Sequence, residues 1–159
     1  MTDTADSTPA REVPLSEWPL LAAAHAQLES ELFKLNKAAL FEALILAGVT
    51  QVVVSFDGYG DSGQTEDVEI KAGDKDVDMP ATVIEFVEAI WGETEPRRSS
   101  VNISTAVENL TYDVLEDAHF GWENGDGAYG DVTFDVAART ITLDHNDRYT
   151  AIENYVHTF

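Results

Sequence analysis

The chain has 159 residues, 44% of them hydrophobic, so it is long enough to bury one core. Thirty Asp and Glu residues face nine Lys and Arg, for a net charge of −21, and such a surface repels nucleic-acid phosphates and anionic lipids. The absence of cysteine excludes disulfides, thiolate metal sites and cysteine nucleophiles. Direct nucleic-acid binding is therefore not expected, and the charge favours cations or a basic protein as partner.

The N-terminal segment, residues 1–14, lacks hydrophobic periodicity and is rich in Thr, Asp and Pro. This composition predicts a disordered tail ahead of a single domain over residues 15–159. The segment has no basic region followed by an apolar stretch, so it is not a secretory signal. No segment approaches the roughly 18 consecutive apolar residues of a membrane span. We expect a cytoplasmic protein that does not bind membranes.

Leucine and alanine recur at helical spacing in the first third of the chain. Behind Ser16, a plausible N-cap, they predict a helix over about residues 17–35. The spacing continues over residues 37–47, between Asn36 and Gly48, and predicts a second helix or a bent continuation of the first.

A third helix is predicted further along the chain. Thr105 and Glu108 form a capping-box pattern, and the apolar stripe that follows ends near His119.

Two hairpins are predicted from alternating patterns. The β-branched run over residues 51–57 and the alternating residues 65–72 flank the glycine-rich loop FDGYGDSG. Beyond a second glycine-rich segment, GWENGDGAYG, Val132, Phe134 and Val136 alternate, and Ile141 and Leu143 follow a short connection. We expect both glycine-rich loops to join hairpins at the same edge of one sheet.

Three segments are less clearly patterned. Residues 81–91 fit a strand or a helix, and we favour an extended start; residues 93–100 are interpreted as a loop. Residues 148–159 fit helical spacing, but their Tyr and Val content favours a further strand. The predicted fold is α+β, with an antiparallel sheet of about four to six strands packed against two or three helices.

The acidic residues are concentrated in two blocks, residues 50–79 and 99–138, whereas the predicted helical residues 15–49 are nearly balanced. Three interpretations compete: a solvated surface that gives solubility, a phosphate-like array presented to a basic nucleic-acid-binding protein, and adaptation to high salt. The many Leu, Ile and Phe residues argue against the third.

The loops contain the candidate site residues. Hard oxygen ligands for Ca²⁺ or Mg²⁺ are available there, although their spacing does not match an EF-hand and Asp is common in such turns for local hydrogen bonding. The candidate metal ligands are Asp57, Asp61, Glu66, Glu123 and Asp126. Exposed aromatic residues among glycines and acids are typical anchors for a partner, whereas a buried Trp122 would close the core. The candidate interaction residues are Asp57, Tyr59, Asp61, Ser62, Gln64, Glu66, Trp122, Glu123, Asn124, Asp126, Tyr129, His145 and Arg148.

Enzyme motifs are not matched. DGYGDSGQ is not the nucleophile elbow of a serine hydrolase, and no glycine pattern fits a nucleotide-binding loop, so no cofactor is predicted beyond Ca²⁺ or Mg²⁺. The four histidines are scattered, and alternation with Ile141 and Leu143 points His145 inward. A hydrogen-bonded structural histidine and a catalytic one both fit that position.

The segments NKAALFEAL, FDGYGDSGQ, GWENGDGAYGDVTFD and TITLDHNDRY together resemble a family of small bacterial proteins of uncharacterised function, often associated with plasmids and mobile elements. The resemblance covers roughly residues 36–159 and implies a bacterial cytoplasmic accessory protein. It carries over no catalytic residue.

The leading hypothesis is a non-enzymatic interaction protein whose acidic loops bind a basic partner, in the manner of a nucleic-acid mimic or a counter-defence protein. The alternative is a small Ca²⁺- or Mg²⁺-dependent binding module or enzyme that uses the acidic glycine-rich loops. The oligomeric state is left open.

Overall fold

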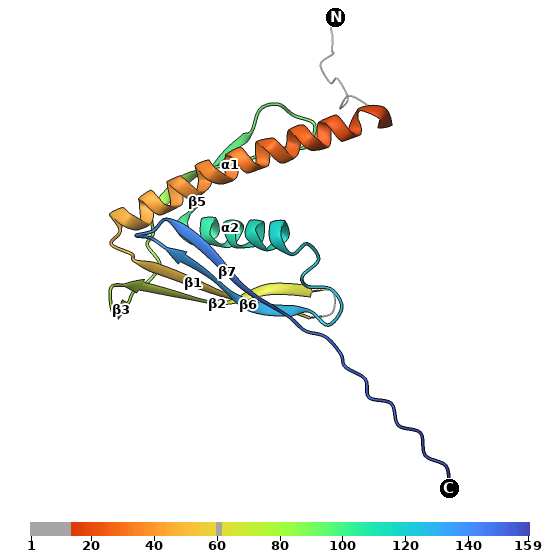
Figure 1. The fold of residues 1–159 in the computed structure, drawn as a ribbon. Helices are drawn as coiled ribbons and strands as arrows, with labels where there is room; N and C mark the ends of the chain where they lie inside the picture. Colours follow the sequence, from red (N-terminus) through yellow and green to blue (C-terminus); the bar gives the residue numbers. More distant parts are fainter. Residues whose placement is uncertain (1–13, 60–61) are drawn as a thin grey trace, which may run out of the picture.

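The computed structural model describes residues 14–59 and 62–159, without the side chains of Tyr59, Ser62 and Glu66. In that part of the chain, helices and antiparallel sheets form an α+β fold, as predicted (Figure 1). The predicted disordered tail lies outside the described residues except for Pro14, which precedes a short 3-10 helix, Leu15–Glu17. No helix of the described residues is long and apolar enough to cross a lipid bilayer.

The main sheet has five antiparallel strands in the order β3-β2-β1-β6-β7, within the predicted range. Both predicted hairpins are present, and they join where β1 pairs with β6. The strands are β1 (Gln51–Tyr59), β2 (Ser62–Ala72), β3 (Lys75–Asp76), β6 (Ala128–Asp135) and β7 (Thr140–Asp147).

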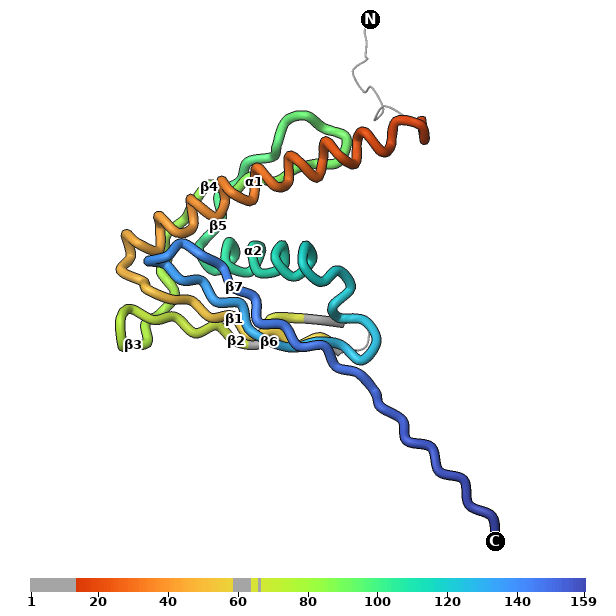
Figure 2. The backbone as a smooth tube through the Cα atoms, in the orientation of Figure 1, coloured from red at the N-terminus to blue at the C-terminus, as the bar shows by residue number. Residues whose placement is uncertain are grey.

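The two faces of the sheet differ because side chains alternate along a strand. Val52, Val54 and Phe56 of β1 are buried beneath the helices, next to Val132 and Phe134 of β6. The helices lie on this face (Figures 1 and 2). The residues between them point to the opposite face, which no helix of the described chain covers.

Helix α1 (Trp18–Leu46) is one continuous helix of 29 residues. Of the two alternatives predicted for residues 37–47, a separate second helix was wrong and a continuation of the first helix is what forms; Asn36 does not cap a helix but is 3% exposed and hydrogen-bonds to the backbone of Val87. Its Nδ2 donates to the carbonyl of Val87 at 2.8 Å, and its Oδ1 accepts from the amide of Val87 at 2.9 Å. Further along α1, Phe41 packs 6.3 Å from the ring of Phe134 and joins the helix to the sheet.

A second, two-stranded sheet consists of β4 (Val83–Glu88) and β5 (Arg97–Asn102). The extended start of residues 81–91 is confirmed, but the loop predicted over residues 93–100 was wrong in its second half. Residues 97–102 form a strand because they pair with β4, and an ion pair of 2.7 Å joins Arg98 to Glu85 across the two strands.

Helix α2 (Ile103–Ala118) follows β5 directly, and its C-cap is His119, as predicted. Its N-cap is Asn102 and not Thr105: the Oδ1 of Asn102 accepts from the Thr105 amide at 2.8 Å. The β5 strand ends where this cap begins, so strand pairing fixes the start of the helix.

The prediction that the glycine-rich segment GWENGDGAYG joins the two strands of a hairpin was wrong, because this segment joins α2 to β6. It nevertheless lies at the same edge as the loop between β1 and β2, because Gly58 at the end of β1 pairs with Ala128 at the start of β6. The prediction that both loops share one sheet edge is thus confirmed by the register.

The further strand predicted over residues 148–159 was wrong. This segment has no regular secondary structure and extends away from the sheet (Figure 2). Its apolar side chains pack against no element of the described chain, and Tyr149, Ile152, Tyr155, Val156 and Phe159 are exposed.

Candidate functional site

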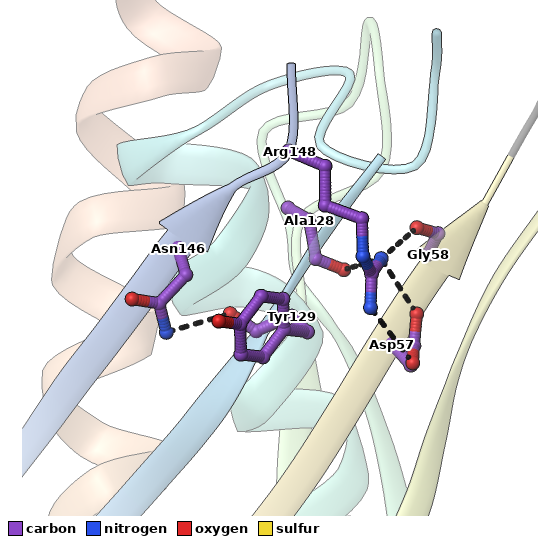
Figure 3. Close-up of polar contacts among 6 residues, drawn as sticks. All are labelled: Asp57, Gly58, Ala128, Tyr129, Asn146 and Arg148. Carbon is purple, nitrogen blue, oxygen red and sulfur yellow. Dashed lines mark hydrogen bonds and ion pairs between the residues drawn. The ribbon is translucent and has the colours of Figure 1, made fainter. Parts of the chain in front are cut away.

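Arg148 fastens the start of the C-terminal segment to the end of β1 (Figure 3). Its guanidinium forms a bidentate pair with Asp57, with Nη1 donating to Oδ1 at 2.9 Å and Nη2 to Oδ2 at 3.1 Å. Nη1 also donates to the carbonyl oxygens of Gly58 at 3.0 Å and Ala128 at 3.4 Å. The hydrogen bond with Asp57 raises the pKa of Arg148, so the guanidinium stays charged.

The guanidinium also lies over the ring of Tyr129, the residue opposite Asp57 in β6, with the guanidinium carbon 4.7 Å from the ring centroid. Asn146 of β7 donates to the carbonyl of Tyr129 at 3.2 Å (Figure 3). Three predicted interaction residues, Asp57, Tyr129 and Arg148, therefore contact one another and join the ends of the strands. Asp57 is neutralised by Arg148.

The two distinctive sequence blocks pack against each other through Gly58 and Trp122. Trp122 is 5% exposed, and its ring makes an edge contact with Phe56 at 5.3 Å between centroids. A Cβ at Gly58 would lie 2.6 Å from Cζ3 of Trp122 and 2.8 Å from the Cα of Glu123. Only glycine fits at position 58, so close to this ring. Of the two alternatives for Trp122, the structure supports a buried residue that closes the core, not an exposed anchor for a partner.

The remaining predicted site residues are dispersed around the glycine-rich loops. Asp126 accepts a hydrogen bond of 2.8 Å from Thr150, Asn124 is exposed, and Glu123 has a buried Oε2 with no hydrogen-bond partner among the described residues. Gln64 lies exposed opposite Asp57. The side chains of Tyr59, Asp61, Ser62 and Glu66 lie outside the description.

The uncovered face of the main sheet carries a concentration of carboxylates. Asp67 of β2, Ser55 of β1, Asp131 of β6 and Asp144 of β7 stand in one row across the strands. The three carboxylate side chains are exposed, and Ser55 donates to the Oδ1 of Asp131 at 3.0 Å. Because neighbouring strands are about 4.8 Å apart, Asp131 and Asp144 lie at about that spacing and Asp67 about twice as far from Asp131.

Acidic residues continue on one side of this row, toward the start of β1. Glu69 and Asp135 are exposed on the same face, and Lys71 lies there with its Nζ 3.0 Å from Asp76 and 3.8 Å from Glu69. The open face is therefore an extended acidic surface, defined here by Asp67, Glu69, Asp131, Asp135 and Asp144.

These residues escaped the prediction, which concentrated on the loops. The alternation of Asp131 and Asp135 with the buried Val132 and Phe134 was the available signal, since it places both acids on the face opposite the core. What the sequence could not supply was the register that aligns them with Asp144.

A separate cleft of about 820 Å³ opens between α1, α2 and β4. Asp113 of α2 lines it together with Glu29 and Glu88. Desolvation in the cleft, followed by the charges of Glu29 and Glu88, raises the pKa of Asp113 to about 6, although water still reaches part of its side chain.

Three side chains at the edge of the core form a further group, namely His119, His145 and Asp147. His145 is 5% exposed, which confirms that it points inward. His119 and Asp147 were not predicted as site residues, because they are distant in sequence from each other and match no metal motif.

The fold and these surfaces define an α+β protein whose sheet is covered by helices on one face and carries carboxylates on the other. Residues 32–159 match the model of a family of unknown function, DUF6878, and the chain belongs to that family. The matched range contains both glycine-rich loops and the second half of α1. No curated protein and no solved structure matches the chain.

Proposed function

We propose that this protein is a non-enzymatic interaction protein that binds a basic protein partner through the open face of its main sheet. The observation that supports the proposal is the row of Asp67, Asp131 and Asp144 across that face. The resemblance of its sequence supports a place in the bacterial cytoplasm, among accessory proteins of plasmids and mobile elements.

The row is unfavourable for folding. Asp131 and Asp144 are direct cross-strand partners, and like charges at such positions destabilise a sheet. Neutral Asn or Thr would fit the same exposed positions without repulsion. An arrangement that weakens the fold yet concentrates charge is explained by binding of a partner that supplies the missing cations.

The surroundings of the row favour Lys and Arg side chains as ligands. Ser55 holds the carboxylate of Asp131, and a depression of about 310 Å³ lined by Val53, Ser55 and Asp67 lies beside it. The positive groups of a partner would be attracted over a long range by the net charge of −21 and paired locally by the row.

The proposal is tested with two triple variants that remove the same number of charges. Asp67→Asn, Asp131→Asn and Asp144→Asn together remove the row. Glu31→Gln, Glu42→Gln and Glu108→Gln remove three exposed carboxylates from the helices. The probe is a fluorescent peptide of alternating Lys and Thr, measured by anisotropy at low and high salt.

Binding of the probe to the wild type and the helix variant, with a loss of about tenfold or more in the row variant, supports the proposal. Equal losses in both variants would mean diffuse attraction to the net charge, and the proposed interface would then be rejected. Binding should weaken as salt increases in every case.

A further inference from the structure

His119, His145 and Asp147 come together where the end of α2 meets the end of β7. His119 is the C-cap of α2, held by a hydrogen bond of 2.8 Å from its amide to the carbonyl of Leu115. His145 and Asp147 are alternate residues of β7 and so point to the same, helix-covered side of the sheet. One ligand atom from each of the three side chains lies within 4.8 Å of the other two.

The side chain of His145 is fixed by its surroundings. Its ring stacks on His119 at 3.6 Å between centroids with an interplanar angle of 3°, and it stacks on Phe56 at 5.8 Å. Gly130 stands opposite His145 in the sheet and contributes no side chain, so Phe56 can reach the imidazole. A rigid, oriented imidazole is the part of a metal site that the fold must provide in advance.

The hydrogen bonding of His145 is incomplete. Its Nε2 lies 2.6 Å from Oδ1 of Asp147, but its Nδ1 is buried and has no partner among the described residues. Buried polar atoms are nearly always paired, and an exception calls for a ligand or another explanation.

We propose that His119, His145 and Asp147 bind one divalent transition-metal ion of the zinc class. Two imidazoles and one carboxylate suit Zn²⁺ and its neighbours, whereas Ca²⁺ and Mg²⁺ prefer oxygen ligands throughout. The proposal thus differs in both residues and metal from the calcium or magnesium site expected in the acidic loops.

To bind one metal ion, the exposed side chains of His119 and Asp147 must change their orientation. Donors bound to one zinc ion at about 2.0–2.2 Å each are more than 3 Å apart, so the Asp147 carboxylate must turn from its hydrogen bond. Asp147 is 72% exposed and His119 is also exposed, so both can rotate while His145 stays in place. Three protein ligands leave one position of a four-coordinate ion open to water.

The test uses the full-length protein after treatment with a chelator. Zn²⁺ binding is measured by calorimetry, and Co²⁺ is added separately because its visible absorption reports four-coordinate geometry. The site variants are His119→Ala and Asp147→Asn, both at exposed positions where folding is expected to persist. The controls are His25→Ala in α1 and His157→Ala in the C-terminal segment, which remove histidines outside the group.

We expect one Zn²⁺ per chain, a rise in melting temperature with Zn²⁺, and about tenfold or more weaker binding in each site variant. The control variants should bind as the wild type does. Full-strength binding in His119→Ala, or equal weakening in a control, would show adventitious surface binding only and would overturn the proposal. None of the three residues lies on the open face, so this outcome leaves the basic-partner proposal untouched.

Discussion

Replacing Gly58 with alanine tests whether the two glycine-rich blocks are packed as closely as the structure shows. The added Cβ would lie 2.6 Å from Cζ3 of Trp122, 2.8 Å from Cε3 of the same ring and 2.8 Å from the Cα of Glu123. Trp122 cannot simply move aside, because it is 5% exposed and in contact with Phe56. Overpacking of this kind lowers the free energy of unfolding by about 1–3 kcal/mol.

Because one of the close atoms belongs to the backbone, we expect a value in the upper half of that range, about 2–3 kcal/mol. Urea unfolding followed by far-ultraviolet circular dichroism measures it. Trp122→Leu provides the matched background, since leucine removes the ring atoms and should reduce the effect of Gly58→Ala by about 1 kcal/mol. A loss below about 0.5 kcal/mol in the wild-type background would refute the packing argument.

Two further predictions concern the helices. Asn36→Ala leaves the buried amide and carbonyl of Val87 unpaired and should lower the free energy of unfolding by about 2–4 kcal/mol. The control Gln27→Ala, on the exposed side of α1, should change the free energy of unfolding by less than about 0.5 kcal/mol. Similar losses of both variants in urea unfolding would contradict the role of Asn36. The raised pKa of Asp113 means that the folded state favours its protonated form, so the associated stability is full below the unfolded value of 3.8 and is lost as pH rises through about 6. Asp113→Asn should therefore stabilise the protein at pH 7.5, by about 0.5–1 kcal/mol after allowing for solvent screening, and the gain over the wild type should vanish near pH 4; a gain independent of pH would rule out this cause.

Local patterns predicted most of the architecture. The alternation around Val52 and around Phe134 gave both hairpins, and the stripe that ends at His119 gave α2. These elements follow from the periodicity of burial, which a sequence displays directly.

Other features depended on contacts between distant segments. Asn36 resembles a helix cap in sequence, but it pairs with Val87, which lies 51 residues away. Residues 97–100 contain no strong strand signal and become a strand because β4 offers an edge. The C-terminal segment has the composition of a strand but no partner within the described chain.

The candidate sites divided in the same way. The two acidic blocks of the sequence contain Asp67 and Asp131 but not Asp144, and only the strand register places the three in one row. The meeting of His119 with Asp147 depends on where α2 ends relative to β7, and no local pattern encodes that position.

The fastening of Arg148 sets where this molecule can be shortened. The last strand ends at Asp147, yet the next residue supplies donors to Asp57, Gly58 and Ala128, and Thr150 bonds Asp126. A truncation after Thr150 would remove the exposed Ile152, Tyr155, Val156 and Phe159 while keeping these hydrogen bonds. A truncation after Asp147, at the end of β7, would remove Arg148 and so leave the carbonyls of Gly58 and Ala128 and the carboxylate of Asp57 without their donor. A domain boundary chosen from secondary structure alone would therefore exclude a residue that the sheet needs.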